Sequence, residues 1–585
     1  MSYGARRAEP RNHRQWFLTL DGQTSRLLRT MTSKDNCDSL EMRNTSMTRW
    51  SIGVAIFLAV YLAASLSTAA DHNPLMPQPQ QIQFEPGQVR VQGLEIRLTS
   101  GAAAEDRFAA NTLSACLSER AASPVAVSEG QAAGRPIVLK RTGGVAALPT
   151  PGEQPGPDSR EAYRLKISGA GIELRAASTA GLFYGAETLC QLVEGQGKRA
   201  FLPDVEIYDW PSLAYRGIMV DVSHGPLPTE DEVKRQLDFL ARWKANQYFF
   251  YSEASIELKG FPLVNREARF SREQVGRIVA YARERHIDVV PCVELYGHLH
   301  DLFRVERYAD LSALPHGSEF NPRNPQVAPL LAAWVEQLTD LFPSSFFHIG
   351  FDETWEITKA AAATGVSPAQ LYLEQLRRVS ELARRRGKTV LFWSDMAAKY
   401  PELIPQIPSG TIVVPWGYDA TVYEPYWAPF ASLPIPKFIA TGVSIWNSIA
   451  PEFEVSFSNI DTFMAAGRQH GILGLINTLW TDDILVLMRP AFPGIAYGAA
   501  AAWQHGPMNR DHFFPDYARI VYPASVASEV APGLAALLRA EVSLSRGVED
   551  GTMRRLWDDP FFPPRLGTFR THRDDLRQAR LEAEQ

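Results

Sequence analysis

The sequence predicts an α/β protein in which a small α+β domain precedes a (β/α)8 TIM barrel. Between residues 213 and 525, short apolar segments alternate with amphipathic helical segments, which is typical of parallel βα units. Eight such units within roughly 300 residues are the size of a TIM barrel. A doubly wound open sheet is the alternative, but the first predicted strand ends in Asp221-Val222-Ser223-His224-Gly225, which is not a Gly-rich phosphate turn.

Alternation of apolar and polar residues, or short apolar runs bounded by turn residues, predicts the barrel strands. They are expected at Tyr215–Val222, Asn246–Ser252, Asp288–Leu295, Phe346–Gly350, Val390–Ser394, Ile412–Trp416, Phe438–Val443 and Leu473–Leu479. Helical spacing of apolar residues predicts the connecting helices. The clearest are Glu230–Trp243, Arg272–Arg285, Val327–Phe342, Pro368–Arg386 and Ile460–His470.

Residues 71–212 are predicted to form the preceding α+β domain. Its expected elements are strands at 89–91, 94–98, 162–168 and 171–176, and helices at 104–119 and 179–193. Residues 526–585 are predicted to be a helical extension, and no function is assigned to them.

Residues 1–70 are expected to be a leader and signal peptide. Met47-Thr48-Arg49 precedes an uncharged stretch from Trp50 to Ala70 that ends in small residues, as secretory signal peptides do. An uncleaved signal anchor is the alternative, because the uncharged stretch is long enough to span a bilayer. Both predict an exported protein, periplasmic or extracellular in the first case and membrane-anchored in the second, with no other membrane contact.

Composition narrows the classes of partner. The 585 residues carry a formal net charge of -6 and no Lys/Arg run in the folded part, so nucleic acid is not expected to bind. No metal-ligand spacing is present, and neither a metal nor a cofactor is expected. A Cys116–Cys190 disulfide is compatible with export, although the spacing does not specify it. Cys292 lies in an apolar strand and is interpreted as a small core residue.

The adjacent carboxylates Asp352 and Glu353 directly follow the predicted fourth strand. Burying one carboxylate without a partner costs several kcal/mol, and two neighbours also repel each other. At the carboxyl end of a barrel strand such a pair is typical of a catalytic site. A helix N-terminus explains the pair equally well when it is taken alone.

Polar and aromatic residues also follow the other strands, on the face where barrel enzymes keep their active sites. Each has an ordinary structural explanation, but their concentration at so many strand ends favours one pocket. Aromatic walls and acids together suit a sugar. The residues are Arg216, Asp221, Glu253, Glu294, His298, Trp393, Asp395, Trp416, Trp446, Asn447, Trp480 and Asp482.

These motifs resemble glycoside hydrolase family 20, the β-N-acetylhexosaminidases, over about residues 75–510. His348-Ile349-Gly350-Phe351-Asp352-Glu353 resembles the family's His-x-Gly-Gly-Asp-Glu, and Arg216-Gly217-Ile218-Met219-Val220-Asp221 its Arg-Gly-x-Met-x-Asp. Gly297-His298 and the tryptophans after strands five, six and eight also match.

The sequence departs from the family pattern at three places, and in this it resembles a divergent branch of the family that includes hexosaminidase D. Phe351 replaces the second glycine, which is expected to tighten the region beside the acid pair. Glu253 replaces an aspartate, and Ser444-Ile445-Trp446-Asn447-Ser448 stands where the family has a tyrosine.

The resemblance implies an exo-acting, retaining hydrolase in which the substrate's own 2-acetamido oxygen attacks and forms an oxazolinium ion. Glu353 would be the general acid and base, and Asp352 would hold the acetamide N–H. His298 and Glu253 would orient Glu353. Because both acids must face the sugar, the strand is expected to end or twist beside them. The implied sugar-binding residues are Arg216, Glu253, His298, Trp393, Asp395, Trp416, Trp446, Asn447, Trp480 and Asp482.

The implied substrate is an oligosaccharide or glycoconjugate that ends in N-acetylhexosamine. Two alternatives stay open: a carbohydrate-binding barrel with little or no activity, and a conventional glycosidase that uses two carboxylates. The preference between N-acetylglucosamine and N-acetylgalactosamine is also open.

Overall fold

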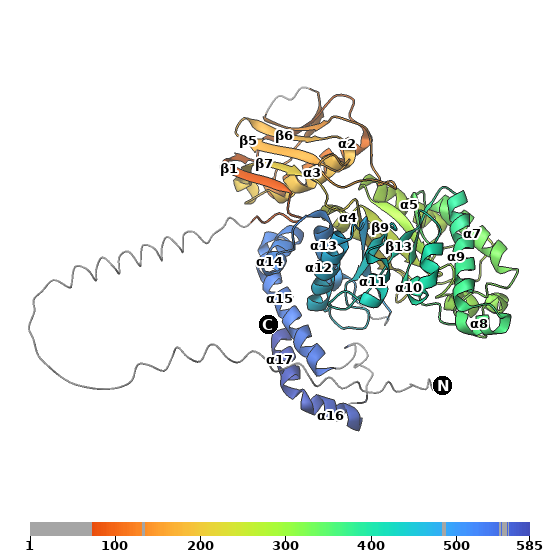
Figure 1. The fold of residues 1–585 in the computed structure, drawn as a ribbon. Helices are drawn as coiled ribbons and strands as arrows, with labels where there is room; N and C mark the ends of the chain where they lie inside the picture. The colour runs from red at the N-terminus through yellow and green to blue at the C-terminus, as the bar shows by residue number, and fades with distance from the viewer. Residues whose placement is uncertain (1–72, 131–134, 483–486, 549–551, 553–558, 560) are drawn as a thin grey trace, which may run out of the picture. The chain divides into compact units, whose positions relative to one another are not determined.

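The computed structural model describes residues 73–130, 135–482, 487–548, 552, 559 and 561–585 (Figure 1). The predicted leader and signal peptide lie outside these residues. Within them, no helix combines the length and apolarity that crossing a membrane requires.

The amino-terminal domain is a seven-stranded sheet packed against two helices. The strand order is β1-β7-β5-β6-β4-β2-β3, with β1, β7, β5 and β6 antiparallel neighbours and the rest parallel. Its strands are β1 Gln81–Arg90, β2 Leu94–Leu98, β3 Val127–Glu129, β4 Arg135–Arg141, β5 Tyr163–Ser168, β6 Gly171–Ala176 and β7 Phe201–Asp209. Helices α2 (Ala104–Ala121) and α3 (Thr179–Gln191) are joined by the Cys116–Cys190 disulfide. The sequence missed β3, β4 and β7.

The second sheet is a barrel of eight parallel strands, and all eight predicted strands are confirmed. They are β8 Tyr215–Asp221, β9 Gln247–Ser252, β10 Asp288–Val293, β11 Phe346–His348, β12 Thr389–Trp393, β13 Ile412–Val414, β14 Phe438–Gly442 and β15 Gly474–Leu479. The order is β13-β12-β11-β10-β9-β8-β15-β14. Parallel bridges Val413–Lys437 and Trp416–Ala440 join β13 to β14 and close the barrel.

Helices surround the barrel (Figure 1). Around the strands lie α4 Glu230–Arg242, α5 Arg272–Glu284, α6 His300–Phe303, α7 Val327–Leu341, α8 Ile357–Thr364, α9 Pro368–Arg385, α10 Asp395–Lys399, α11 Glu424–Ala431, α12 Phe453–Gln469 and α13 Phe492–Trp503. The chain ends in α14 Arg510–Val521, α15 Ala524–Gly547, α16 Pro563–Thr571 and α17 Arg573–Ala583. Side-chain caps at Thr229, Ser271 and Ser367 fix the starts of α4, α5 and α9.

Strands β8, β9 and β10 are buried along their whole length, which explains why they appear as apolar runs rather than alternating segments. Large side chains fill the barrel interior, and the unpaired Cys292 is one of its buried residues. The strand ends therefore stand on a packed core, not on an open channel.

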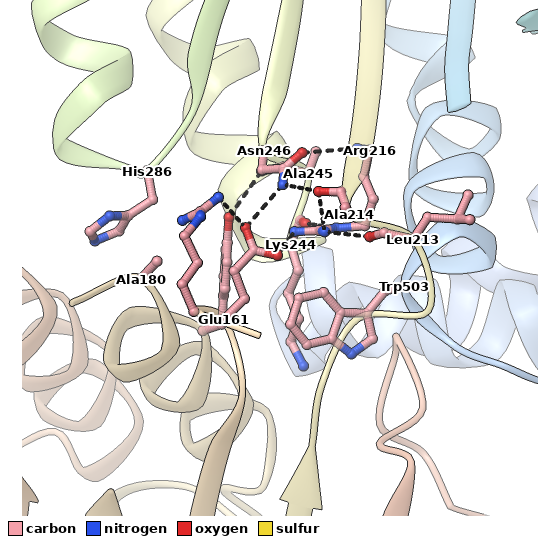
Figure 2. Close-up of polar contacts among 12 residues, drawn as sticks. Glu161, Ala180, Leu213, Ala214, Arg216, Lys244, Ala245, Asn246, His286 and Trp503 are labelled. Atoms are coloured by element: carbon pink, nitrogen blue, oxygen red, sulfur yellow. Dashed lines mark hydrogen bonds and ion pairs between the residues drawn. The ribbon is translucent and has the colours of Figure 1, made fainter. Parts of the chain in front are cut away.

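A buried ionic cluster joins the amino-terminal domain to the start of the barrel strands (Figure 2). Arg216 Nη2 lies 2.6 Å from Glu161 Oε2, and Arg160 Nη2 lies 2.7 Å from Glu161 Oε1. Asn246 Nδ2 donates a hydrogen bond to the same Glu161 oxygen at 2.9 Å. The Arg216 guanidinium also donates to the carbonyls of Lys244 and Leu213.

The prediction that Arg216 binds the sugar is therefore wrong. Its side chain is fully buried, and it lies at the amino-terminal end of β8, opposite the end where barrel sites form. All its described contacts serve the junction between the two domains, where it also lies 4.8 Å from the ring of Trp503.

Candidate active site

A pocket of about 270 Å³ opens at the carboxyl ends of the barrel strands. It brings together eight of the predicted site residues with three others. The lining residues are His224, Tyr251, His298, Asp352, Glu353, Trp393, Trp416, Tyr418, Trp446, Trp480 and Asp482.

The backbone turns sharply where the acid pair begins. Strand β11 ends at His348, and Gly350, Phe351 and Glu353 then adopt positive φ angles of 74°, 84° and 48°. A side chain at Gly350 would overlap the Glu294 carboxyl group, so this position needs glycine. The expected end of the strand is confirmed, and it allows both acids to line the same pocket. Left-handed backbone at non-glycine residues is costly and is typical of functional sites.

Phe351 does not enter the pocket. It is buried between Tyr296 and Tyr372, with ring centroids 5.4 and 5.8 Å away, and its carbonyl accepts a hydrogen bond from the Tyr372 hydroxyl. The tightening expected from this residue therefore occurs in the core behind the acid pair.

His298 lies beside both acids. Its Nε2 is 3.4 Å from Asp352 Oδ2 and 3.7 Å from Glu353 Oε2, while its Nδ1 is 3.9 Å from Glu253 Oε1. The Asp352 side chain is 10% exposed and that of Glu353 is 40% exposed, so Asp352 lies deeper and Glu353 faces the opening. The two acids therefore occupy different levels of one pocket.

The surroundings of the acid pair raise the pKa values of both Glu353 and His298. Burial raises the pKa of Glu353 above its ordinary value, the Asp352 charge raises it further, and the His298 charge opposes both. Burial alone would lower the pKa of His298, but Asp352, Glu294 and Glu253 hold this pKa well above its usual range. Histidine therefore stays charged here at neutral pH, while Glu353 keeps its proton to higher pH than an exposed glutamate.

Glu253 lies behind the pocket wall and contacts three of its residues. Its Oε1 accepts a hydrogen bond from Tyr251 at 3.1 Å and lies 3.6 Å from His224 Nε2. Burial raises the pKa of Glu253 to about 7, against the lowering effect of His224 and His298. The position suits a residue that orients His298, and it does not place Glu253 against a sugar.

Asp395, expected to contact substrate, lies instead beneath the pocket and holds two of its parts. One carboxylate oxygen accepts the Glu353 backbone N–H at 3.0 Å, and the other accepts the Trp416 indole N–H at 3.4 Å. Burial, with the Asp352 charge, raises the pKa of Asp395 to about 7. Asp395 therefore positions the general-acid candidate and one wall of the pocket.

Aromatic residues make most of the wall, as predicted for Trp393, Trp416, Trp446 and Trp480. The Trp480 indole donates a hydrogen bond to the Tyr418 hydroxyl at 2.9 Å, and its ring packs edge-on against Tyr251 at 4.7 Å. Asn447 does not line the pocket; its side-chain oxygen accepts a hydrogen bond from Ser448.

Sequence reasoning missed three lining residues: His224, Tyr251 and Tyr418. The signal available for His224 was its position three residues after Asp221. Tyr251 and Tyr418 each lie two residues from a predicted site residue. His224 Nδ1 lies 2.8 Å from Asp221 Oδ2. Burial lowers the pKa of His224, but the bond to Asp221 and its charge raise this pKa to about 9.

Asp221, His224 and Asp482 each offer one ligand atom, and these atoms lie within 4.8 Å of one another. They are the described group most able to hold a cation. However, the Asp221 carboxylate already accepts hydrogen bonds from Ser223, His224 and Thr481. These donors stabilise its charge without a metal, and no step of the chemistry below uses one.

Comparison with known proteins decides the family. Residues 72–210 match the family described as "Glycosyl hydrolase family 20, domain 2", and residues 213–424 match its catalytic domain. The chain belongs to glycosyl hydrolase family 20. The likeness to the hexosaminidase D branch is not tested by these matches.

The similar curated proteins of family 20 are distant. A "Beta-hexosaminidase" of Porphyromonas gingivalis is 27% identical over 41% of this chain and 36% of its own length. One of Vibrio furnissii is 26% identical over 44% and 48%. The chain thus matches between about a third and a half of the length of these relatives.

Solved structures of the family share the fold. A β-N-acetylhexosaminidase of Streptomyces coelicolor has a TM-score of 0.63 at 21% identity, with 78% of this chain and 96% of the other covered. One of Bacteroides fragilis has a TM-score of 0.62 at 20% identity, covering 77% and 97%. At these identities the likeness supports the (β/α)8 fold and the preceding domain.

Proposed function

We propose that this protein is an exo-acting, retaining β-N-acetylhexosaminidase that removes terminal N-acetylhexosamine from oligosaccharides or glycoconjugates. The observation that carries this proposal is the acid pair, Asp352 and Glu353, which shares an aromatic-walled pocket with a charged His298. The pocket, about 270 Å³, is slightly smaller than the usual range for ligand sites of about 300–1,000 Å³ and suits one terminal sugar.

In the proposed reaction the acetamido oxygen of the substrate attacks the anomeric carbon as the glycosidic bond breaks. Glu353 donates its proton to the leaving oxygen, then removes a proton from the water that opens the oxazolinium ion. Asp352 accepts the acetamide N–H and stabilises the positive charge that develops there. The raised pKa of Glu353 keeps its proton available for the first step.

The arrangement disfavours both alternatives. An inactive sugar-binding barrel would have no need for an acid of raised pKa that faces the opening beside His298. A two-carboxylate glycosidase needs a second carboxylate across the sugar. Among the described residues, Glu253 and Asp395 lie behind the wall, and the remaining lining carboxylate, Asp482, is at the exposed rim.

Turnover of aryl β-N-acetylglucosaminide and galactosaminide tests the proposed activity directly. We expect release of the aryl group from at least one epimer, and inhibition by a thiazoline analogue of the oxazolinium ion. Absence of turnover with both epimers would refute the activity and leave the sugar-binding alternative.

We also propose that the protein is exported. This rests on residues 47–70, and the Cys116–Cys190 disulfide supports it because disulfides persist in oxidising compartments. Cell fractionation with an antibody to the barrel would contradict export if the protein were recovered only from the cytoplasm.

The pH dependence of kcat/KM should move in opposite directions in two variants. Glu353 acts protonated, so activity is lost as pH rises through its pKa. Asp352→Asn removes a charge that raises this pKa, so the alkaline limb should move to lower pH. His298→Asn removes a charge that lowers it, so the limb should move to higher pH.

These profiles are measured on a disaccharide, because protonation of a poor leaving group limits its hydrolysis. Shifts in the same direction in both variants would contradict the assignment of Glu353 as the titrating acid.

A further inference from the structure

We propose that Trp355 and Lys399, with Tyr423 after the next strand of the barrel, form the subsite for the leaving group, and that the leaving group is a second sugar ring. This rests on the proposed function and adds the substrate class to it: an oligosaccharide rather than a small glycoside.

Trp355 lies next to the general-acid candidate and is exposed. Its backbone N–H donates a hydrogen bond to the Glu353 carbonyl at 2.8 Å, and the residue is 50% exposed. The proton donor must contact the leaving oxygen, so the leaving group lies beside Glu353. The nearest large exposed ring in the sequence, two residues away, is therefore in a position to meet it.

Lys399 adds hydrogen-bond donors to this surface. Its Nζ lies 4.4 Å from the centroid of the Trp355 ring, and among the described residues no carboxylate pairs with it. In the part of the chain that the structure describes, the Lys399 ammonium group is held only by cation–π contacts, with Trp355 and, at 5.5 Å, with the ring of Tyr400, and such contacts are worth little at an exposed site. It can move aside and donate to the hydroxyls of a sugar that stacks on Trp355.

Aromatic rings also run from the pocket wall to the surface on the next loop. Trp416 lines the pocket, Tyr426 packs against it at 4.8 Å, and Tyr423 packs against Tyr426 at 4.9 Å. Tyr423 is 38% exposed. A Cβ atom at position 417 would lie 2.6 Å from Tyr423 Cβ. Glycine at this position therefore lets Tyr423 pack close to the backbone that follows Trp416.

Trp355, Lys399 and Tyr423 follow three successive neighbouring strands, β11, β12 and β13. Exposed aromatic rings together with an exposed ammonium group match the chemistry of a pyranose, which has an apolar face and a rim of hydroxyls. A peptide or a lipid leaving group would not need this combination of flat rings and a donor.

The test compares two substrates of the epimer that the enzyme accepts: a β-linked disaccharide of N-acetylhexosamine and the methyl β-glycoside. In Trp355→Ala the ratio of kcat/KM for disaccharide over methyl glycoside should fall about three- to tenfold. Trp355→Phe should retain part of the ratio, and Lys399→Met should lower it by a smaller factor. Phe84→Ala, which removes an exposed ring from β1, is the matched control and should leave both rates unchanged.

Equal loss on both substrates, or no loss on either, would overturn the subsite while the proposed activity stands. A loss confined to a glycopeptide or glycolipid substrate would overturn the choice of a second sugar. Failure of the unmodified enzyme to hydrolyse any aryl N-acetylhexosaminide would refute the proposed function, and this inference would fall with it.

Discussion

Glu353→Gln should lower kcat/KM for a disaccharide by about 10²–10⁴-fold, because the leaving sugar then departs without a proton. Glutamine keeps the size and polarity of the side chain, and the backbone N–H of residue 353 still donates to Asp395. Sugar binding should therefore survive, which inhibition by a thiazoline analogue would measure.

An activated aryl glycoside provides the internal control for Glu353→Gln. Its leaving group needs little protonation, so the loss on this substrate should be much smaller than the loss on the disaccharide. Near-normal turnover of the disaccharide would show that Glu353 is not the general acid.

Arg216→Met should lower the free energy of unfolding by about 3–5 kcal/mol, because it leaves buried Glu161 with an incomplete set of cationic partners. The carbonyls of Lys244 and Leu213 also lose their donor. Urea unfolding followed by tryptophan fluorescence measures the loss. KM of the folded enzyme should stay unchanged, since Arg216 lies at the far end of the barrel.

Two further variants test whether the lost ion pair causes the predicted loss of stability in Arg216→Met. Arg216→Met combined with Glu161→Gln should recover part of the stability, because neither charge is then buried without its partner. Arg107→Met removes an ion pair with Glu129 that is about half exposed and should change little. A large rise in KM for Arg216→Met at unchanged stability would restore Arg216 to the sugar site.

The fold could be predicted because periodicity and strand length are local properties. All eight barrel strands lie where apolar runs occur in the sequence, and only their ends differ by up to two residues. In the smaller domain, β3, β4 and β7 were missed. Strand β7 carries Pro203, which is unfavourable in strands, although it lies at a register break opposite edge strand β1.

The site could be predicted where a residue ends a strand or follows it within a few residues, as Trp393, Trp480, Asp352 and Glu353 do. Arg216 shows the limit of that rule. A strand rises about 3.3 Å per residue, so Arg216 lies about 16 Å from Asp221 at the other end of β8. Arg216 was assigned to the site because it matches a family motif, but it lies at the start of β8 and not at its end.

Residues beyond the strand ends were harder to place, because loop geometry depends on long-range contacts. Asp395 is the first residue of α10, and its burial beneath Trp416 follows from the fold of the neighbouring strand. His224 enters the pocket because Asp221 fixes its ring, a contact that sequence spacing alone suggests weakly.

Hydrolysis of aryl glycosides with progressively fluorinated N-acetyl groups tests substrate assistance most directly. Fluorine withdraws electrons from the acetamido oxygen and weakens it as a nucleophile. If that oxygen attacks the anomeric carbon beside Asp352, kcat/KM should fall stepwise from the acetyl to the trifluoroacetyl substrate. Rates that do not depend on fluorination would show that a group of the protein is the nucleophile and would contradict the proposed mechanism.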